Sequence, residues 1–210
     1  MDIYWQGHSC FRIRGKDATV VIDPFQPDIG YQLGQFEADV VVVTHQHPGH
    51  NYVEGIQGEP KQVTSPGEYE IMNVFIVGIG TFHDDQKGEL RGSNTAYLIE
   101  MEGVSICHLG DLGHLPTSQM FAELGSVDVL MLPVGGASTI DAAGAAEVMR
   151  RLGPKVVIPM HYKTGALSRE LEPVDRFLKE TGVNEVSSQP KLSFTKASLP
   201  ASTQVFLLDY

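Results

Sequence analysis

The chain has 210 residues, of which 42% are hydrophobic, enough to bury on the order of 70% of the surface that an unfolded chain exposes. Its formal net charge of -11 argues against sequence-independent binding to nucleic acid or to an anionic membrane, because both select clustered Lys and Arg. We therefore expect a single domain over residues 1–210, with no nucleic-acid or membrane partner and with homo-oligomerisation left open.

The cysteines and the first residues favour a cytoplasmic protein. Cys10 and Cys107 each lie in an apolar, strand-like stretch, so we expect both thiols to be reduced and buried. No apolar run approaches the roughly 18 residues of a membrane span. The opening MDIYWQGHSC also lacks the basic and apolar regions of a signal peptide.

Short runs of β-branched and aromatic residues predict most of the elements of the first half. The first three strands form an antiparallel meander, and the stretch 26–37 has no periodicity, so we expect a loop that borders a pocket. A connection rich in Gly and Pro precedes residue 73. The predicted strands are 3–5, 10–14, 18–22, 40–43 and 73–82.

The second half alternates between buried strands and helices after a polar insert at 85–94. Helix 139–152 is capped by Thr139 or Asp141, and 170–180 has apolar residues at helical spacing. The other predicted elements are helix 117–124 and strands 95–101, 104–109, 128–134, 155–160 and 204–208.

The stretch VVVTHQHPGHN delivers three imidazoles within six residues, directly after an apolar strand. His45 and His47 are two residues apart, so an extended backbone points them to the same side, and the Pro-Gly break lets His50 turn back. Neutral imidazole is the commonest metal ligand, and zinc takes three or four such groups. We therefore interpret the stretch as a metal-ligand loop.

Four predicted strands lead directly into a residue of metal-ligand type: His45, His83, Asp111 and His161. Strands of one sheet that end on the same edge place such residues around one crevice. A lone His or Asp at a strand end is more often an ordinary loop residue. The metal site is predicted because four such residues follow strands in a chain that also contains the histidine loop.

These residues resemble a known family. HQHPGH, with His83, Asp111 in HLGDLGH and His161 in PMHY, resembles the metallo-β-lactamase fold superfamily, whose motif is His-x-His-x-Asp-His followed by later His, Asp and His ligands. GHSCFRI and VVIDPF are similar, more narrowly, to the branch that includes L-ascorbate-6-phosphate lactonase. The resemblance implies an α/β fold, an αββα sandwich of two mixed β-sheets flanked by helices, with a two-metal cleft at one edge.

The resemblance also assigns roles within the site. It places His45, His47 and His83 at one metal and His50 and His161 at a second, with Asp111 bridging, and it gives catalytic roles to Asp111, His45 and His161. Asp23 ends a strand, where its carboxylate either accepts the free N–H of a ligand histidine or caps a turn before Pro24.

One position departs from the family motif. Gly49 stands where the family has an Asp that both ligates the second metal and acts on the attacking water. A single-metal enzyme, a two-metal enzyme with a substitute ligand and a non-catalytic binding relative all stay open. His8 in GHSCF is the preferred substitute, and His114 is another candidate.

The ligand set favours a metal-dependent hydrolase holding one or two Zn²⁺ ions, with Mn²⁺ as the alternative, because soft ligands are missing. A metal-activated water would attack a small lactone or phosphoester, with phosphodiesterase or nuclease activity as the competing enzyme class. Arg91 or Lys163 could pair with an anionic substrate group, and the backbone amides of 135–139 could hold a phosphate. Arg91 and Lys163 can also be explained as solvated loop charges, and the stretch 135–139 as a helix cap.

Overall fold

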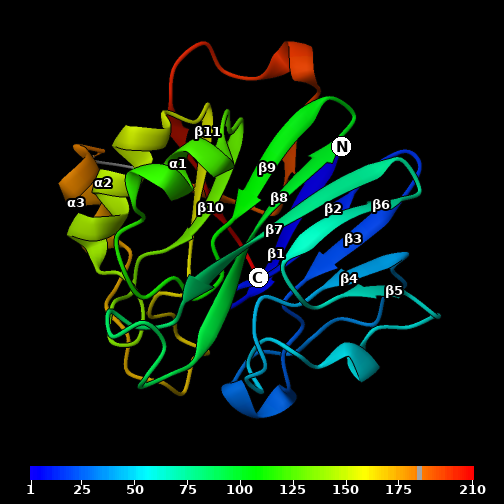
Figure 1. Cartoon of the computed structure of the whole chain (residues 1–210), viewed down its shortest axis with the longest axis horizontal. Helices are drawn as coiled ribbons and strands as arrows, with labels where there is room; N and C mark the ends of the chain where they lie inside the picture. Colours follow the sequence, from blue (N-terminus) through cyan, green and yellow to red (C-terminus); the bar gives the residue numbers. More distant parts are fainter. Residues whose placement is uncertain (184–185) are drawn as a thin grey trace.

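Two β-sheets packed face to face form the centre of the computed structural model, which describes residues 1–183 and 186–210 (Figure 1). The first sheet has six strands in the order β13 (Leu192–Ser193), β1 (Asp2–Gly7), β2 (Cys10–Arg14), β3 (Thr19–Ile22), β4 (Val40–Val42) and β5 (Lys61–Val63). The second has seven, in the order β14 (Gln204–Val205), β11 (Val156–Met160), β10 (Val129–Pro133), β9 (Val104–His108), β8 (Ser93–Met101), β7 (Val74–Phe82) and β6 (Gly67–Ile71). A short pair joins β12 (Ser188–Gln189) to β15 (Leu207–Leu208).

Strand direction brings several strand ends to one edge of the molecule. In the first sheet β1 and β3 are both antiparallel to β2, and β4 is parallel to β3, so all three end on the same side. In the second sheet β7 and β9 are both antiparallel to β8, and β9, β10 and β11 are parallel. Chain segments that leave these strands therefore meet at the lower edge in Figure 1.

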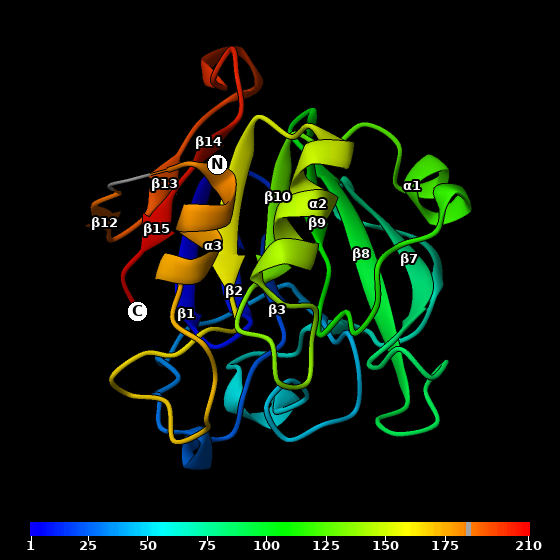
Figure 2. The same ribbon diagram turned by 90° about the vertical axis from the view of Figure 1, so that its left-hand side faces the viewer.

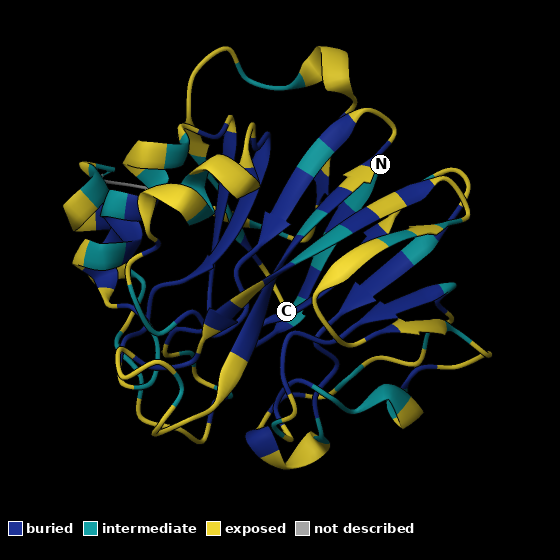
Figure 3. Ribbon diagram, in the orientation of Figure 1, coloured by how far each residue is buried: buried dark blue, intermediate teal, exposed yellow. Residues whose placement is uncertain are grey.

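Alternation along the strands divides the apolar residues between two cores. Val20 and Ile22 face the space between the sheets, whereas Val21 of the same strand joins a smaller cluster on the other face. The parallel strands β10 and β11 are buried along their whole length, as expected for strands covered on both faces (Figure 3). Cys10 and Cys107 are both buried and unbridged, as predicted.

The α-helices α1 (Ser118–Leu124), α2 (Ala142–Leu152) and α3 (Asp175–Thr181) lie on the outer side of the seven-stranded sheet (Figures 1 and 2). The outer face of the six-stranded sheet is covered by the loop that follows β3. Phe25, Ile29 and Tyr31 pack on its outer face, with a short 3₁₀ helix at Pro27–Ile29. The predicted loop 26–37 therefore packs on the outer face of this sheet. It does not line the cavity that lies beside His45 and His47, which is described below.

Most predicted elements are confirmed, and the differences have local causes. The helix predicted from 170 begins at Asp175, because Glu172 uses its backbone N–H and C=O to bond Gly135 and Lys163. Asp141 is the N-cap of α2, accepting from the Gly144 amide at 2.8 Å. Strands β5, β6, β12 and β13 are not predicted from the sequence. Among the described residues, no helix combines the length and apolar composition needed to cross a bilayer.

Candidate metal centre

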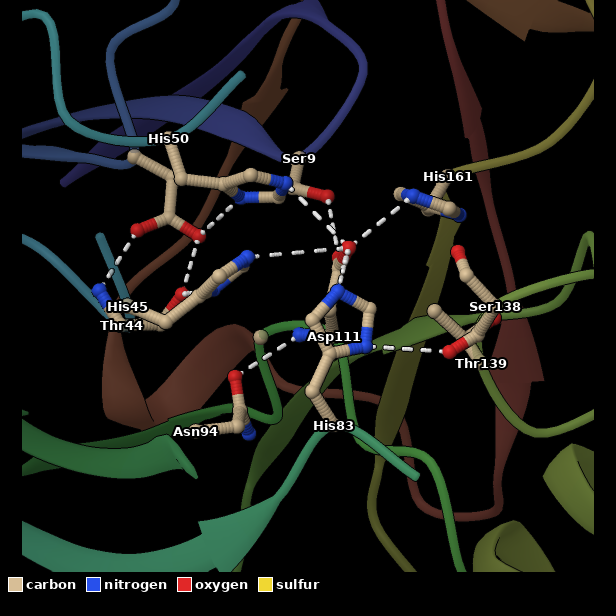
Figure 4. A network of polar contacts seen from close by, with 12 residues as sticks. Ser9, Thr44, His45, His50, His83, Asn94, Asp111, Ser138, Thr139 and His161 are labelled. Carbon is tan, nitrogen blue, oxygen red and sulfur yellow. Dashed lines mark hydrogen bonds and ion pairs between the residues drawn. The ribbon is translucent and has the colours of Figure 1, made fainter. Parts of the chain in front are cut away.

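Four imidazoles converge on one carboxylate oxygen at the edge where the strands end (Figure 4). The Nε2 atoms of His83 and His161 lie 3.2 Å from Asp111 Oδ2, that of His50 lies at 3.3 Å, and that of His45 at 3.9 Å. All five side chains are buried. Residues separated by more than 100 positions thus form one cluster.

The cluster is built by both sheets. His45 follows β4 of the six-stranded sheet, whereas His83, Asp111 and His161 follow β7, β9 and β11 of the other sheet. The expectation that these residues lie on the edge of one sheet is therefore corrected. Because the sheets pack face to face with several strands ending on the same side, their exit loops close over the space between them.

The ring nitrogens that face away from Asp111 are held by specific acceptors. His50 Nδ1 lies 2.9 Å from Asp23 Oδ2, and His83 Nδ1 lies 3.0 Å from the Ser138 carbonyl oxygen. His45 Nδ1 lies 3.0 Å from Thr44 Oγ1. Since Thr44 donates its own hydroxyl proton to Asp23 at 2.7 Å, we infer that His45 donates from Nδ1. In these rings Nε2 is consequently the nitrogen that faces the centre and is available to a cation.

Asp23 lies behind the His50 ring, the first of the two roles considered for it, and its second contact is with the chain beyond β4, not with a turn before Pro24. Its Oδ1 accepts the Thr44 backbone N–H at 2.8 Å, which fixes the chain where it leaves β4, and its Oδ2 holds the His50 ring from behind. The residue is fully buried and has a left-handed backbone, with φ of 50°. Such a conformation is uncommon outside glycine, and it recurs at His8 and His161, each with φ of 52°.

The turn that presents Asp111 is held by a residue that sequence reasoning missed. Asn94 Oδ1 accepts the Asp111 N–H at 3.0 Å, and its Nδ2 donates to the Leu109 carbonyl at 2.9 Å. Gly110 is required between them, because its φ is 57° and a Cβ would collide with Asn94 and Thr44. Ser9 Oγ lies 3.5 Å from Asp111 Oδ1, so the carboxylate keeps Oδ2 toward the imidazoles. An Asn at a strand start carries no sequence signal for this role.

The buried carboxylates and imidazoles of the centre shift one another's pKa values. Burial alone would lower the pKa of His50, but Asp111 and Asp23 outweigh it and raise that pKa to about 10. Burial alone would raise the pKa of Asp111, yet His161 and His50 hold it well below its ordinary range. Burial, followed by the neighbouring His50, lowers the pKa of His45 to about 3. The centre therefore contains ionised carboxylates beside a neutral His45 and a protonated His50, and His50 must release a proton when a cation binds.

The donor set fits a divalent cation. The potential ligand atoms form two groups, and within each group they lie within 4.8 Å of one another. One group is His45, His47 and His83, and the other is His8, His50 and His161. Several buried ring nitrogens have no hydrogen-bond partner among the residues that the structure describes: His45 Nε2, His50 Nε2 and both nitrogens of His8 and of His161. Buried polar atoms are rarely left in this state, and a cation would bind one nitrogen of each ring. His47 is only half-buried, at the open side of the group.

Two other features singled out in the sequence, the candidate ligand His114 and the candidate phosphate-binding stretch 135–139, do not belong to the cluster. His114 Nε2 accepts the Phe82 backbone N–H at 3.3 Å and its Nδ1 lies 3.0 Å from the Leu115 carbonyl, so neither nitrogen is available as a ligand. The stretch 135–139, whose amides could hold a phosphate, does not open a helix as expected. The amides of Ser138 and Thr139 already bond the Gly136 carbonyl, and α2 begins only at residue 142.

A cavity of about 370 Å³ opens beside His45 and His47. Arg91 is the charged residue among its lining residues, and none of the described lining residues is a carboxylate although the chain carries a net charge of -11. Five other lining residues carry hydroxyl groups, namely Thr44, Thr64, Ser65, Ser93 and Thr95, and the lining is completed by Gln46, Pro66 and Gly92. Lys163 is exposed and donates to the Arg169 carbonyl at 3.1 Å.

Comparison with known proteins gives consistent results. The family described as beta-lactamase superfamily domain matches residues 2–161. A UPF0173 metal-dependent hydrolase from Methanoculleus marisnigri is 31% identical over 207 residues, covering 86% of this chain and 90% of that protein. Another from Thermococcus kodakarensis is 31% identical over 186 residues, covering 75% of this chain and 83% of that protein. The crystal structure of a proposed Zn-dependent hydrolase of the metallo-β-lactamase superfamily from Thermotoga maritima superposes with a TM-score of 0.83, at 38% identity, covering 99% of this chain and 97% of that one.

The chain therefore belongs to the metallo-β-lactamase superfamily and has its fold, as the histidine loop and strand exits predict. Within that superfamily it is a metal-dependent hydrolase, similar over most of its length to the UPF0173 metal-dependent hydrolases.

Proposed function

We propose that the chain hydrolyses a small anionic, hydroxylated substrate, a phosphorylated lactone or phosphoester, at one or two Zn²⁺ or Mn²⁺ ions held by the imidazole cluster. The observation that carries the proposal is the approach of four Nε2 atoms to Asp111 Oδ2, at 3.2 to 3.9 Å, beside an open cavity. His45, His47 and His83 would hold one ion, His50 and His161 the other, with Asp111 between them.

A bound divalent cation supplies Lewis acidity and lowers the pKa of a water molecule toward neutrality. The chain's own residues supply position and charge. Asp23 and Thr44 keep the Nδ1 atoms of His50 and His45 occupied, so the Nε2 atoms stay free for the ions. Asp111 would act as the shared carboxylate, and His45 and His161 would border the reacting group.

The lining of the cavity supports an anionic substrate. A phosphate or carboxylate group would meet the Arg91 guanidinium without an opposing carboxylate, while sugar-type hydroxyls would meet Thr64, Ser65 and Ser93. The volume of about 370 Å³ suits a small molecule and lies at the low end of ligand pockets. These features also disfavour a polynucleotide, which needs an extended basic surface.

Hydrolysis assays on phosphorylated sugar lactones, phosphomonoesters and a phosphodiester, with Zn²⁺ or Mn²⁺ added, test the proposal. We expect Asp111→Asn to abolish turnover and Arg91→Gln to raise KM for the anionic substrate at least tenfold, with a smaller effect on kcat. Lys61→Gln, which removes an exposed charge outside the cavity lining, is the matched control and should change neither constant. Equal activity of Arg91→Gln on anionic and neutral substrates would contradict the role of Arg91.

A further inference from the structure

We propose that His8 is a ligand of the second metal position, together with His50 and His161, and that Gly49 provides the space for its ring. The inference rests on the proposed function, since it assigns a further ligand to the same centre. It also answers why a glycine occupies the middle of the histidine loop.

The His8 side chain is completely buried, and neither of its ring nitrogens has a hydrogen-bond partner within residues 1–183 and 186–210. Its nearest aromatic neighbours are the rings of His161 and His50, with centroids 4.5 Å and 4.9 Å away. Leaving both nitrogens of a buried imidazole unpaired is costly, and packing it against two further imidazoles adds no acceptor. A divalent cation shared by the three rings binds one nitrogen of each of them at once.

The backbone of His8 is fixed without help from its ring. Its carbonyl oxygen accepts both the Trp5 indole N–H and the His161 backbone N–H, each at 3.0 Å. The residue has φ of 52°, in the turn that joins β1 to β2. The turn therefore stays in place when the side chain changes, so the ring itself can be tested.

Gly49 is not explained by its backbone, because its φ is outside the left-handed region that favours glycine. What it provides is room. A Cβ built on Gly49 would lie 3.1 Å from His8 Nε2 and 3.3 Å from His8 Cδ2, tighter than side chains normally pack. A side chain at position 49 and the His8 ring thus compete for one volume beside the second metal position.

The test is metal content after dialysis against Zn²⁺, measured by elemental analysis on the full chain. We expect about two equivalents for the unaltered protein, as in a two-metal site. His8→Asn, chosen because Asn tolerates a left-handed backbone, should hold about one equivalent after dialysis, because the second position loses one of its four protein ligands, His8, His50, His161 and the shared Asp111. The double variant His8→Asn/Gly49→Asp should regain the second equivalent, since the new carboxylate enters the volume that the ring leaves.

His114→Asn is the matched control, because that imidazole lies near the centre but has both nitrogens bonded to backbone. It should keep the metal content of the unaltered protein. Two equivalents in His8→Asn, or one in the unaltered protein, would overturn the role of His8 while leaving the hydrolase proposal standing. No metal in the unaltered protein would overturn the proposed function itself.

A measurement on the unaltered protein covers the case in which His8→Asn fails to fold. After loading with ¹¹³Cd and labelling histidine with ¹⁵N, a coupling between cadmium and a His8 ring nitrogen is expected, as for His50 and His161. Couplings to His50 and His161 without one to His8 would overturn the proposal.

Discussion

At the scale of single residues, the protonation of the His50 ring depends on Asp23. The carboxylate accepts from Nδ1 at 2.9 Å, so Nε2, which faces Asp111, is the nitrogen that gives up its proton when a cation binds. An amide in its place presents an N–H₂ group toward either Thr44 or His50. If that group faces His50, the ring must move its proton to Nε2 and cannot bind a cation there.

We therefore expect Asp23→Asn to weaken metal binding by about 10–100-fold, the usual effect of losing a carboxylate behind a ligand histidine. Chelator competition with a Zn²⁺ indicator measures the affinity. Asp39→Asn is the control, because Asp39 also accepts a backbone N–H, from Thr19 at 2.8 Å, yet lies at the start of β4, away from the centre. Equal losses in both variants would point to general destabilisation instead.

At the scale of elements, the loop after β7 is organised by one buried carboxylate. Asp84 accepts the backbone N–H groups of four residues at 2.7 to 2.9 Å: Gln86, Gly88, Leu90 and Arg91. These bonds fold the predicted polar insert into a compact loop and set the position of Arg91 on the cavity. The adjacent Asp85 is exposed and contacts only the Gln86 side chain among the described residues.

We expect Asp84→Ala to release this loop, because four amides lose their acceptor together. Amide hydrogen exchange at 86–91 should speed up by at least tenfold, while the Zn²⁺ content stays unchanged. Asp85→Ala should leave the exchange rates as they are. If both variants exchange alike, Asp84 does not organise the loop.

At the scale of the whole molecule, buried histidines give the metal-free protein a defined pH dependence. Burial lowers the pKa of His8, His45 and His108 below 6.5, so the unfolded chain binds more protons below that pH and stability falls as the pH decreases. His50 acts in the opposite direction. Its pKa is raised to about 10, so its contribution is complete below pH 6.5 and is lost between pH 6.5 and 10.

Stability of the metal-free protein should therefore be greatest near pH 6.5. Each histidine that takes up a proton only on unfolding contributes a slope of about 1.4 kcal/mol per pH unit. Denaturant unfolding followed by the fluorescence of Trp5, the single tryptophan, at pH 5 to 9 with chelator present measures the curve. A free energy of unfolding that rises steadily across this range would contradict the prediction.

Metal should stabilise the whole molecule, because it binds residues that only the folded state brings together. With free Zn²⁺ at about 100 times Kd, the gain is about 2.7 kcal/mol, equivalent to roughly 5–10 °C in Tm for a chain of this size. Differential scanning calorimetry with Zn²⁺ and with excess chelator compares the two states. Asp111→Asn should show little of this shift, and an equal shift in that variant would place the stabilising metal elsewhere.

The sequence supported the larger part of the fold. Residues 40–43 and 155–160 are correctly predicted as strands, because the first is a run of four valines and the second contains the β-branched run 156–158. Asp141 carries a capping signal that acts locally. The short strands β5 and β13 escaped prediction. Strand β5 pairs with β4 through only three residue pairs and β13 with β1 through two, so their conformation follows from the neighbouring strand and not from their own composition.

By itself, the sequence determined which ligand-type residues exist and that they follow strands, since imidazole chemistry and strand periodicity are properties of single residues and their near neighbours. Only the tertiary structure decided that two sheets share the centre, that Asn94 holds Asp111, and that His8 fills the space beside Gly49. These are contacts between residues more than 15 positions apart, and sheet packing and strand direction set them. Local sequence does not encode such distances, because they arise when the whole core is buried at once.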